Sequence, residues 1–186
     1  MKSALIVIDV QQSFQQRPYW REDGVAGFVS RVQQLIDRCR ARGVPVLQVF
    51  HVEEDQGPTG PFSLRSGFVK ALSALRIEPT EVFHKTVHSA LYGRAASGET
   101  LEQWLRENGI DHVIITGIRT EQCCETTTRH ASDAGFKVTC AIDATLTFPM
   151  VSKSGRTYTA EEIMDRTELV LANRFANVVR TKAVIV

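Results

Sequence analysis

The sequence has few cysteines, no long apolar run and almost no excess charge, and each of these absences excludes a class of protein. Its four cysteines show no CxxC spacing, so neither a zinc knuckle nor a disulfide framework is expected. No stretch reaches the roughly 18 apolar residues of a membrane span and no secretory leader is recognisable, which predicts a cytoplasmic protein. Lys and Arg number 22 against 21 Asp and Glu, and no basic run contains aromatic residues. We therefore expect neither nucleic acid nor a membrane as a partner.

Apolar runs rich in β-branched residues recur along the chain. Near-continuous runs of this kind are typical of parallel strands that are buried on both faces. They cover residues 5–10, 44–52, 81–85, 112–118 and 137–143, with a weaker run from 177 to 186.

Helical patterns lie between these runs. Apolar residues from 25 to 39 recur at the spacing of an amphipathic helix, which Gly43 is expected to end. A shorter helix is expected around 101–105, and Thr159-x-x-Glu162 resembles a capping box that opens another helix.

The alternation of strands and helices predicts one α/β domain over residues 1–186. We expect an open, mostly parallel, Rossmann-like sheet with helices on both faces, that is, a three-layer αβα sandwich. In such sheets ligands bind beyond the carboxyl ends of the strands. Polar residues at these ends are therefore candidates for a functional site, and they are Asp9, His51, Lys85 and the segment 117–123.

Two adjacent cysteines, Cys123 and Cys124, lie where the helix after the fourth strand is expected to begin. Adjacent side chains on a helix point about 100° apart, so the pair is poorly placed for a disulfide. A helix N-terminus favours a thiolate, so one cysteine is a candidate nucleophile whose pKa we expect to be lowered. Such a thiol also needs a base and a cation, and Asp9 and Lys85 are of the right types.

Three segments, in this order and at this spacing, resemble the isochorismatase-like cysteine hydrolase family. They are LIVIDVQ at 5–11, with Phe14 following, HKTVHSAL at 84–91 and GIRTEQC at 117–123. Residues 143–145, DAT, also match, so the likeness covers nearly the whole chain. The family nucleophile lies six residues after the motif glycine, Gly117, which makes it Cys123. Cys124 stands where the family usually has Val and is interpreted as a small core residue.

The resemblance implies a catalytic triad of Asp9, Lys85 and Cys123. The implied enzyme cleaves a C–N bond of a small amide, ureido or carbamoyl compound through a thioester on Cys123. Backbone N–H groups of Arg119 and Cys123 would hold the oxyanion, next to a cis peptide bond between Ile118 and Arg119. The family also implies a small-molecule substrate and a homo-oligomer, a dimer or larger.

No metal or other cofactor is expected. Nicotinamidases of this family carry a D-x-H pair after the second strand, whereas this chain has Val49, Phe50 and His51 there. Nicotinamidase activity is therefore less expected. Isochorismatases proper often lack the cysteine, so isochorismate is not favoured as the substrate either.

Candidate substrate-binding residues lie on the loops at the crevice side of the sheet. They are Phe14, Trp20, His51, Tyr92, Arg119 and Phe148. The alternatives are core or interface packing for the aromatic residues, an ion pair for Arg119, and ordinary hydrogen-bonded or solvent-facing roles for His51, His84 and His88. The chain departs from the family pattern at Ser13 and His130, where Asp is common, and in the segment 93–98, which looks longer.

Two other functions stay open on the sequence. The first is a thiol redox protein that uses Cys123 and Cys124, although adjacent helical cysteines pair poorly. The second is a non-catalytic small-molecule-binding module on the same sheet. For a nucleotide this would require a glycine in the first turn, and residues 10–13 contain none.

Overall fold

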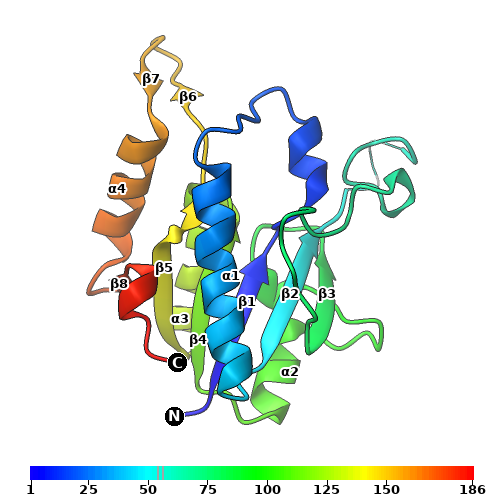
Figure 1. The fold of residues 1–186 in the computed structure, drawn as a ribbon, viewed down its shortest axis with the longest axis vertical. Coiled ribbons are helices and arrows are strands. Elements are labelled where there is room, and N and C mark those ends of the chain that lie inside the picture. The colour runs from blue at the N-terminus through cyan, green and yellow to red at the C-terminus, as the bar shows by residue number, and fades with distance from the viewer. Residues whose placement is uncertain (54, 56) are drawn as a thin grey trace.

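A computed structural model describes residues 1–53, 55 and 57–186 (Figure 1). In this part of the chain, six parallel strands form one sheet in the order β3-β2-β1-β4-β5-β8. Their bounds are β1 Ser3–Ile8, β2 Val46–His51, β3 Glu81–Lys85, β4 His112–Ile118, β5 Lys137–Leu146 and β8 Asn177–Val179. The strand order reverses at β1, so the crevice between β1 and β4 is the place where such sheets bind ligands.

Helices cover both faces of the sheet, which confirms the predicted three-layer αβα arrangement. They are α1 Val25–Ala41, α2 Leu101–Glu107, α3 Glu125–Asp133 and α4 Ala160–Leu171. Figure 1 shows α1 in front of the sheet and α2 and α3 behind it. All six residues of β1 are buried. Because successive strand side chains point to opposite faces, Leu5 and Val7 pack with α1, whereas Ala4, Ile6 and Ile8 pack with α2 and α3.

The helix boundaries follow the local signals in the sequence. The α1 helix ends at Ala41, and Gly43, with φ of +66°, accepts the left-handed conformation of the C-cap. Thr159 and Glu162 form the expected capping box at the start of α4. Within the described residues, no helix combines the length and apolar content that crossing a bilayer requires.

Two strand predictions need correction. The first strand ends at Ile8 rather than at residue 10, because Asp9 turns the backbone with φ of +54°. The last strand stops at Val179, and a 3₁₀ turn over Thr181–Ala183 follows. The reason is that the Asp143 carboxylate accepts hydrogen bonds from both the backbone N–H and the hydroxyl of Thr181, which turns the chain away from the sheet.

Loops rise above the carboxyl ends of the strands, at the top of Figure 1. They include the 3₁₀ turn Gln12–Gln16 after β1 and a two-stranded hairpin, β6 Met150–Val151 and β7 Thr157–Tyr158, which precedes α4. The loop after β1 lies over the crevice side of the sheet. Segments that follow β1, β2, β3 and β4, rather than the sheet itself, supply most walls of the cavity described next.

Candidate active site

The carboxyl ends of three strands bring Asp9, Lys85 and Cys123 together. Asp9 follows β1, Lys85 is the last residue of β3, and Cys123 lies in a π-helical turn, Thr120–Cys124, between β4 and α3. The side chains of Asp9 and Lys85 are completely buried, and Cys123 is 6% exposed. The three residues that the sequence named therefore form one dry cluster.

The motif glycine, Gly117, lets β1 and β4 approach each other next to this cluster. It has φ of +139°, and a Cβ at this position would lie 2.0 Å from the carbonyl oxygen of Ile8. Only glycine tolerates this conformation and this approach. The peptide bond between Ile118 and Arg119, which follows immediately, is cis.

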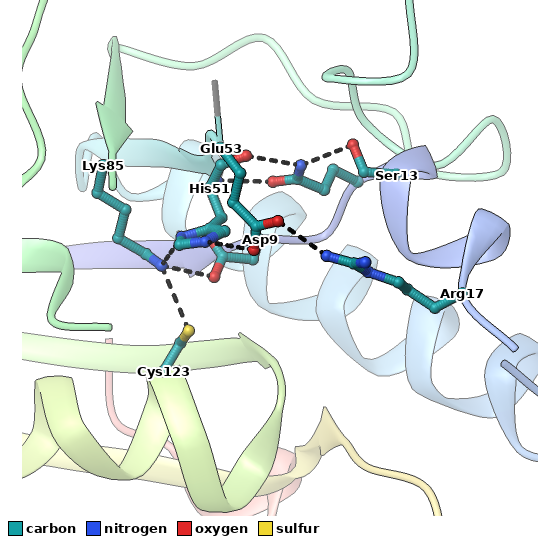
Figure 2. Close-up of polar contacts among 8 residues, drawn as sticks. Asp9, Ser13, Arg17, His51, Glu53, Lys85 and Cys123 are labelled. Carbon is teal, nitrogen blue, oxygen red and sulfur yellow. Dashed lines mark hydrogen bonds and ion pairs between the residues drawn. The ribbon is translucent and has the colours of Figure 1, made fainter. Parts of the chain in front are cut away.

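The Lys85 ammonium contacts three acceptors (Figure 2). Its Nζ lies 2.8 Å from Asp9 Oδ2, 3.3 Å from Cys123 Sγ and 3.2 Å from His51 Nδ1. An ammonium has three N–H donors, which matches this set of one ion pair with Asp9 and two hydrogen bonds, to Cys123 and His51. Burial acts to lower the pKa of Lys85, but the Asp9 carboxylate and the Cys123 sulfur outweigh it, so the pKa of Lys85 is raised and the amine stays charged.

The pKa of Cys123 is raised, contrary to the expected lowering. Burial is the largest cause and the Asp9 carboxylate the second, while Lys85 acts in the opposite direction. Loss of water penalises the thiolate, and the carboxylate beside it adds repulsion. Together these two effects on the pKa of Cys123 outweigh the opposite effects of the cation and the helix. The resting cluster therefore holds a Cys123 thiol beside a charged Lys85.

Cys124 lies away from this cluster, in the apolar core behind the sheet, as predicted. It is almost completely buried, and burial is the first cause that raises its pKa well above that of an ordinary thiol. All four cysteines of the chain are free thiols.

His51 extends the cluster toward the loops. Its Nε2 lies 3.3 Å from Glu53 Oε1, and Glu53 Oε2 accepts a hydrogen bond of 2.9 Å from Arg17. Burial and the charge of Lys85 lower the pKa of His51, against the opposing effect of the Asp9 and Glu53 carboxylates. A neutral His51 can accept from Lys85 at Nδ1 only if its proton is on Nε2, where it is donated to Glu53.

A cavity of about 90 Å³ opens beside Cys123. Aromatic, charged and amide side chains line it, namely Phe14, Arg17, Tyr19, His51, Glu53, Phe62, His88, Gln122 and Cys123. Phe14 and Phe62 pack edge to face, and the guanidinium of Arg17 lies 4.5 Å from the centre of the Phe62 ring. The cavity is thus small, with a mixed polar and aromatic wall.

Two of the candidate substrate-binding residues, Phe14 and His51, line this cavity. Trp20, Tyr92 and Phe148 are not among the described residues that line it. Phe148 is buried and Trp20 packs against its ring, with 5.2 Å between the ring centres. Tyr92 is 59% exposed and lies against His130. Phe148 and Trp20 thus pack against each other, which is the alternative considered for the aromatic residues, whereas Tyr92 is exposed apart from its contact with His130.

Arg119 is not among the described residues that line the cavity either. Its guanidinium pairs with Glu121 at 3.0 Å and lies 4.9 Å from the centre of the Tyr19 ring. Both charged side chains are less than one tenth exposed. The side chain of Arg119 thus connects the loop after β1, through Tyr19, to the turn that carries Cys123.

The sequence reasoning missed Arg17, Glu53, Phe62 and Gln122 as cavity residues. Gln122 could have been found, because it directly precedes Cys123, the candidate nucleophile. Arg17, Glu53 and Phe62 lie on loops without hydrophobic periodicity, so no signal in the sequence marked them.

Ser13 and His130, the two single residues that depart from the family pattern, form hydrogen bonds outside the cavity. Ser13 is buried, accepts a hydrogen bond from Gln11 and donates one to the carbonyl oxygen of Phe68. Nδ1 of His130 lies 2.7 Å from the hydroxyl of Ser89. Neither Ser13 nor His130 is among the described residues at the cavity wall.

The residues at the carboxyl end of β2 do not fit a metal ion. Val49 offers no donor atom and is fully buried. Both ring nitrogens of His51 are already engaged, one by Lys85 and the other by Glu53. In the described part of the chain, no group of three or more His, Cys, Asp and Glu side chains is arranged to hold a metal.

Comparison with known proteins identifies the family. The family model of the isochorismatase domain matches residues 3–181. The uncharacterized isochorismatase family protein YrdC of Bacillus subtilis is 29% identical over 99% of this chain and 95% of its own length. Nicotinamidase 3 of Arabidopsis thaliana is 29% identical over 95% of this chain and 84% of its own length.

A solved structure shares the fold as well. An isochorismatase from Pseudomonas putida KT2440 superposes with a TM-score of 0.80 at 28% identity, covering 98% of this chain and 90% of the other. The family model, the relatives and the fold agree over nearly the whole length, and the chain therefore belongs to the isochorismatase family of hydrolases.

Proposed function

We propose that the protein is a metal-independent cysteine hydrolase that cleaves a C–N bond of a small amide, ureido or carbamoyl compound. One observation carries this proposal: the Lys85 ammonium binds both the Asp9 carboxylate and the Cys123 sulfur beside a cavity. A thiol, a carboxylate and a cation within contact distance are the groups that covalent acyl transfer requires.

The first half-reaction forms a thioester. The Asp9 carboxylate takes the proton of the Cys123 thiol as the sulfur attacks the substrate carbonyl carbon, and the carbonyl oxygen becomes an oxyanion. The raised pKa of Cys123 means that this transfer accompanies the attack instead of preceding it. The tetrahedral intermediate then collapses, the C–N bond breaks, and the nitrogen leaves as ammonia or an amine with the proton from Asp9.

The second half-reaction releases the acid. The Asp9 carboxylate takes a proton from water, the resulting hydroxide attacks the thioester carbon, and the C–S bond breaks. The thiolate leaves and recovers the proton from Asp9. Lys85 keeps its charge throughout and stabilises whichever of its two neighbours is negative.

The oxyanion is assigned to the backbone N–H groups of Arg119 and Cys123. Support comes from their position in the turn that carries the nucleophile, after the cis bond between Ile118 and Arg119. Donors of this kind act on charge that develops in the transition state, in a site from which water is excluded.

The substrate class follows from the cavity and the family. A volume of about 90 Å³ admits a small group, and a wall with both donors and acceptors suits an amide or urea. The relative named nicotinamidase acts on an amide, which supports the reaction type. The donor set at the carboxyl end of β2 supports a mechanism without metal.

The test is a panel of small amides, ureas and carbamoyl acids, assayed for released ammonia. Parent protein and Cys123→Ser are compared, and intact-protein mass spectrometry follows the adduct. With the parent protein, we expect ammonia from at least one substrate and a mass increase from the thioester on Cys123. The serine variant has no sulfur at this position, so it should form no thioester. Turnover that persists unchanged in Cys123→Ser, or no turnover of any C–N substrate, would overturn the proposal.

A further inference from the structure

We propose that His51 is a positioning residue, which takes the third hydrogen bond of the Lys85 ammonium and so aims the other two at Asp9 and Cys123. The inference rests on the proposed function to the extent that Cys123 is the nucleophile. It gives a role to a cavity residue that would otherwise be only part of the wall.

The argument begins with the donors of Lys85. The ammonium is completely buried and its three acceptors come from three elements: Asp9 after β1, His51 at the end of β2 and Cys123 in the turn after β4. An ammonium on a four-carbon stem rotates freely unless each N–H is held. A buried donor without a partner is costly, so loss of the His51 acceptor would let the ammonium turn or draw in water.

Both the backbone N–H and the backbone carbonyl oxygen of His51 are hydrogen-bonded to one side chain. The side chain of Gln11, fully buried, accepts from the His51 N–H at 2.8 Å and donates to the His51 carbonyl oxygen at 3.0 Å. The imidazole packs edge-on against the ring of Phe62, with 5.7 Å between centres. A side chain fixed in this way can define a direction for Lys85.

Glu53 sets which nitrogen of His51 accepts. By receiving the Nε2 proton, Glu53 leaves Nδ1 with a lone pair directed at Lys85. Arg17 in turn fixes Glu53, and Figure 2 shows the resulting chain from Arg17 through Glu53 and His51 to Lys85. Outer partners of this kind commonly orient a functional group rather than react.

His51 acts through Lys85 and not on the thiol directly. Across residues 1–53, 55 and 57–186, no hydrogen bond joins His51 to Cys123. Among the described residues, the charged and titratable groups in contact with the ammonium are Asp9, Cys123 and His51. Glu53 and Arg17 lie behind His51, and His88 lines the same cavity. An effect of His51 on the thiol must therefore pass through the position of the cation.

The experiment compares two substitutions of His51 in the full chain. His51→Phe keeps a ring against Phe62 but removes the acceptor, whereas His51→Asn places an amide oxygen near the position of Nδ1. His84→Phe is the matched control, because His84 is a half-buried histidine on β3 whose ring contacts Phe50. Circular dichroism and thermal unfolding establish that each variant is folded.

The readout is the pH dependence of iodoacetamide labelling at Cys123, which needs no substrate. In His51→Phe, the less well-aimed cation stabilises the thiolate less, so the apparent pKa of Cys123 moves upward from the parent value. His51→Asn and His84→Phe are expected to stay close to the parent. With a substrate from the panel, His51→Phe lowers kcat by about 10-fold or more with little change in KM.

A labelling curve of folded His51→Phe that superimposes on the parent curve would overturn the inference, and so would equal shifts in His51→Phe and His51→Asn. If folded His51→Phe cannot be obtained, His51→Asn compared with His51→Ala decides the question by the same criterion. Failure of the proposed function is a separate outcome, because it would appear as no C–N turnover by the parent whatever the labelling curves show.

Discussion

The Nζ of Lys85 lies 3.3 Å from the sulfur of Cys123, and yet the pKa of this thiol is raised. A cation at this distance favours the thiolate, but burial and the Asp9 carboxylate act against it and outweigh it. The thiol is thus poised between a base and a cation, and its proton has a defined acceptor. Because of this balance, substitutions of Lys85 and Asp9 should shift the apparent pKa of Cys123 in opposite directions.

The two adjacent cysteines should differ sharply when each is replaced. Cys123→Ala removes the nucleophile and is expected to abolish C–N hydrolysis. Cys124→Val fills the same buried apolar site with a side chain of similar size, so turnover should stay within a few-fold of the parent. Ammonia release by the two purified, folded variants measures this, and equal losses would contradict the assignment of the nucleophile.

The pH dependence of labelling at Cys123 should give an apparent pKa higher than that of an ordinary thiol, which is about 8.5. Lys85→Met removes the cation that favours the thiolate, so the apparent pKa should rise further. Asp9→Asn removes the carboxylate that disfavours the thiolate, so the apparent pKa should fall. Because the groups titrate as a coupled unit, the prediction concerns the macroscopic value of the cluster. Superimposable curves for the parent and Lys85→Met would show that Lys85 does not act on the thiolate.

In Asp9→Asn, labelling of Cys123 should become faster while turnover becomes slower. This variant gains thiolate at a given pH but loses the group that carries the proton in both half-reactions. We expect turnover to fall by roughly 10²–10⁴-fold, the usual contribution of a general base. An Asp9→Asn protein that labels faster and also turns over normally would remove Asp9 from the mechanism.

Exhaustive chelation should leave activity intact. Val49 provides no ligand, and His51 is committed to Lys85 and Glu53. The measurement is turnover before and after dialysis against a strong chelator, with metal content determined in parallel. Stoichiometric zinc or iron that leaves together with activity, and restores it on readdition, would require His51 to be reinterpreted as a ligand.

Breaking the ion pair of Arg119 should destabilise the fold more than it changes the chemistry. Arg119→Met leaves Glu121 charged at a position that is 9% exposed, which costs about 3 kcal/mol or more in the free energy of unfolding. The control is Arg156→Met, because the pair of Arg156 with Glu162 is 60% and 43% exposed and should contribute less than about 1 kcal/mol. Urea denaturation of both variants gives the comparison, and equal losses would show that the Arg119 pair is not an anchor.

The order of the elements, and the residue types that gather at the strand ends, could be predicted from the sequence. Hydrophobic periodicity depends on which faces of an element are buried, so α1 and the strands could be predicted from it. Caps such as Thr159 act within one turn of the chain, so they too are visible in the sequence. The resemblance to the family pointed to Cys123 rather than Cys124 and to Asp9 and Lys85 as its partners. The carboxyl ends of parallel strands meet at one edge of a sheet, which is why these residues could be expected to lie together.

The direction of the pKa shift of Cys123, the walls of the cavity and the contacts of His51 could be read only from the tertiary structure. A pKa depends on how much water a fold removes, which no local pattern reports, so the helix N-terminus suggested the wrong sign. Arg17, Glu53 and Phe62 meet only because loops distant in sequence fold over the same strand ends. The same long-range packing buried Phe148 and turned the Arg119 side chain into an anchor for the loop above the nucleophile.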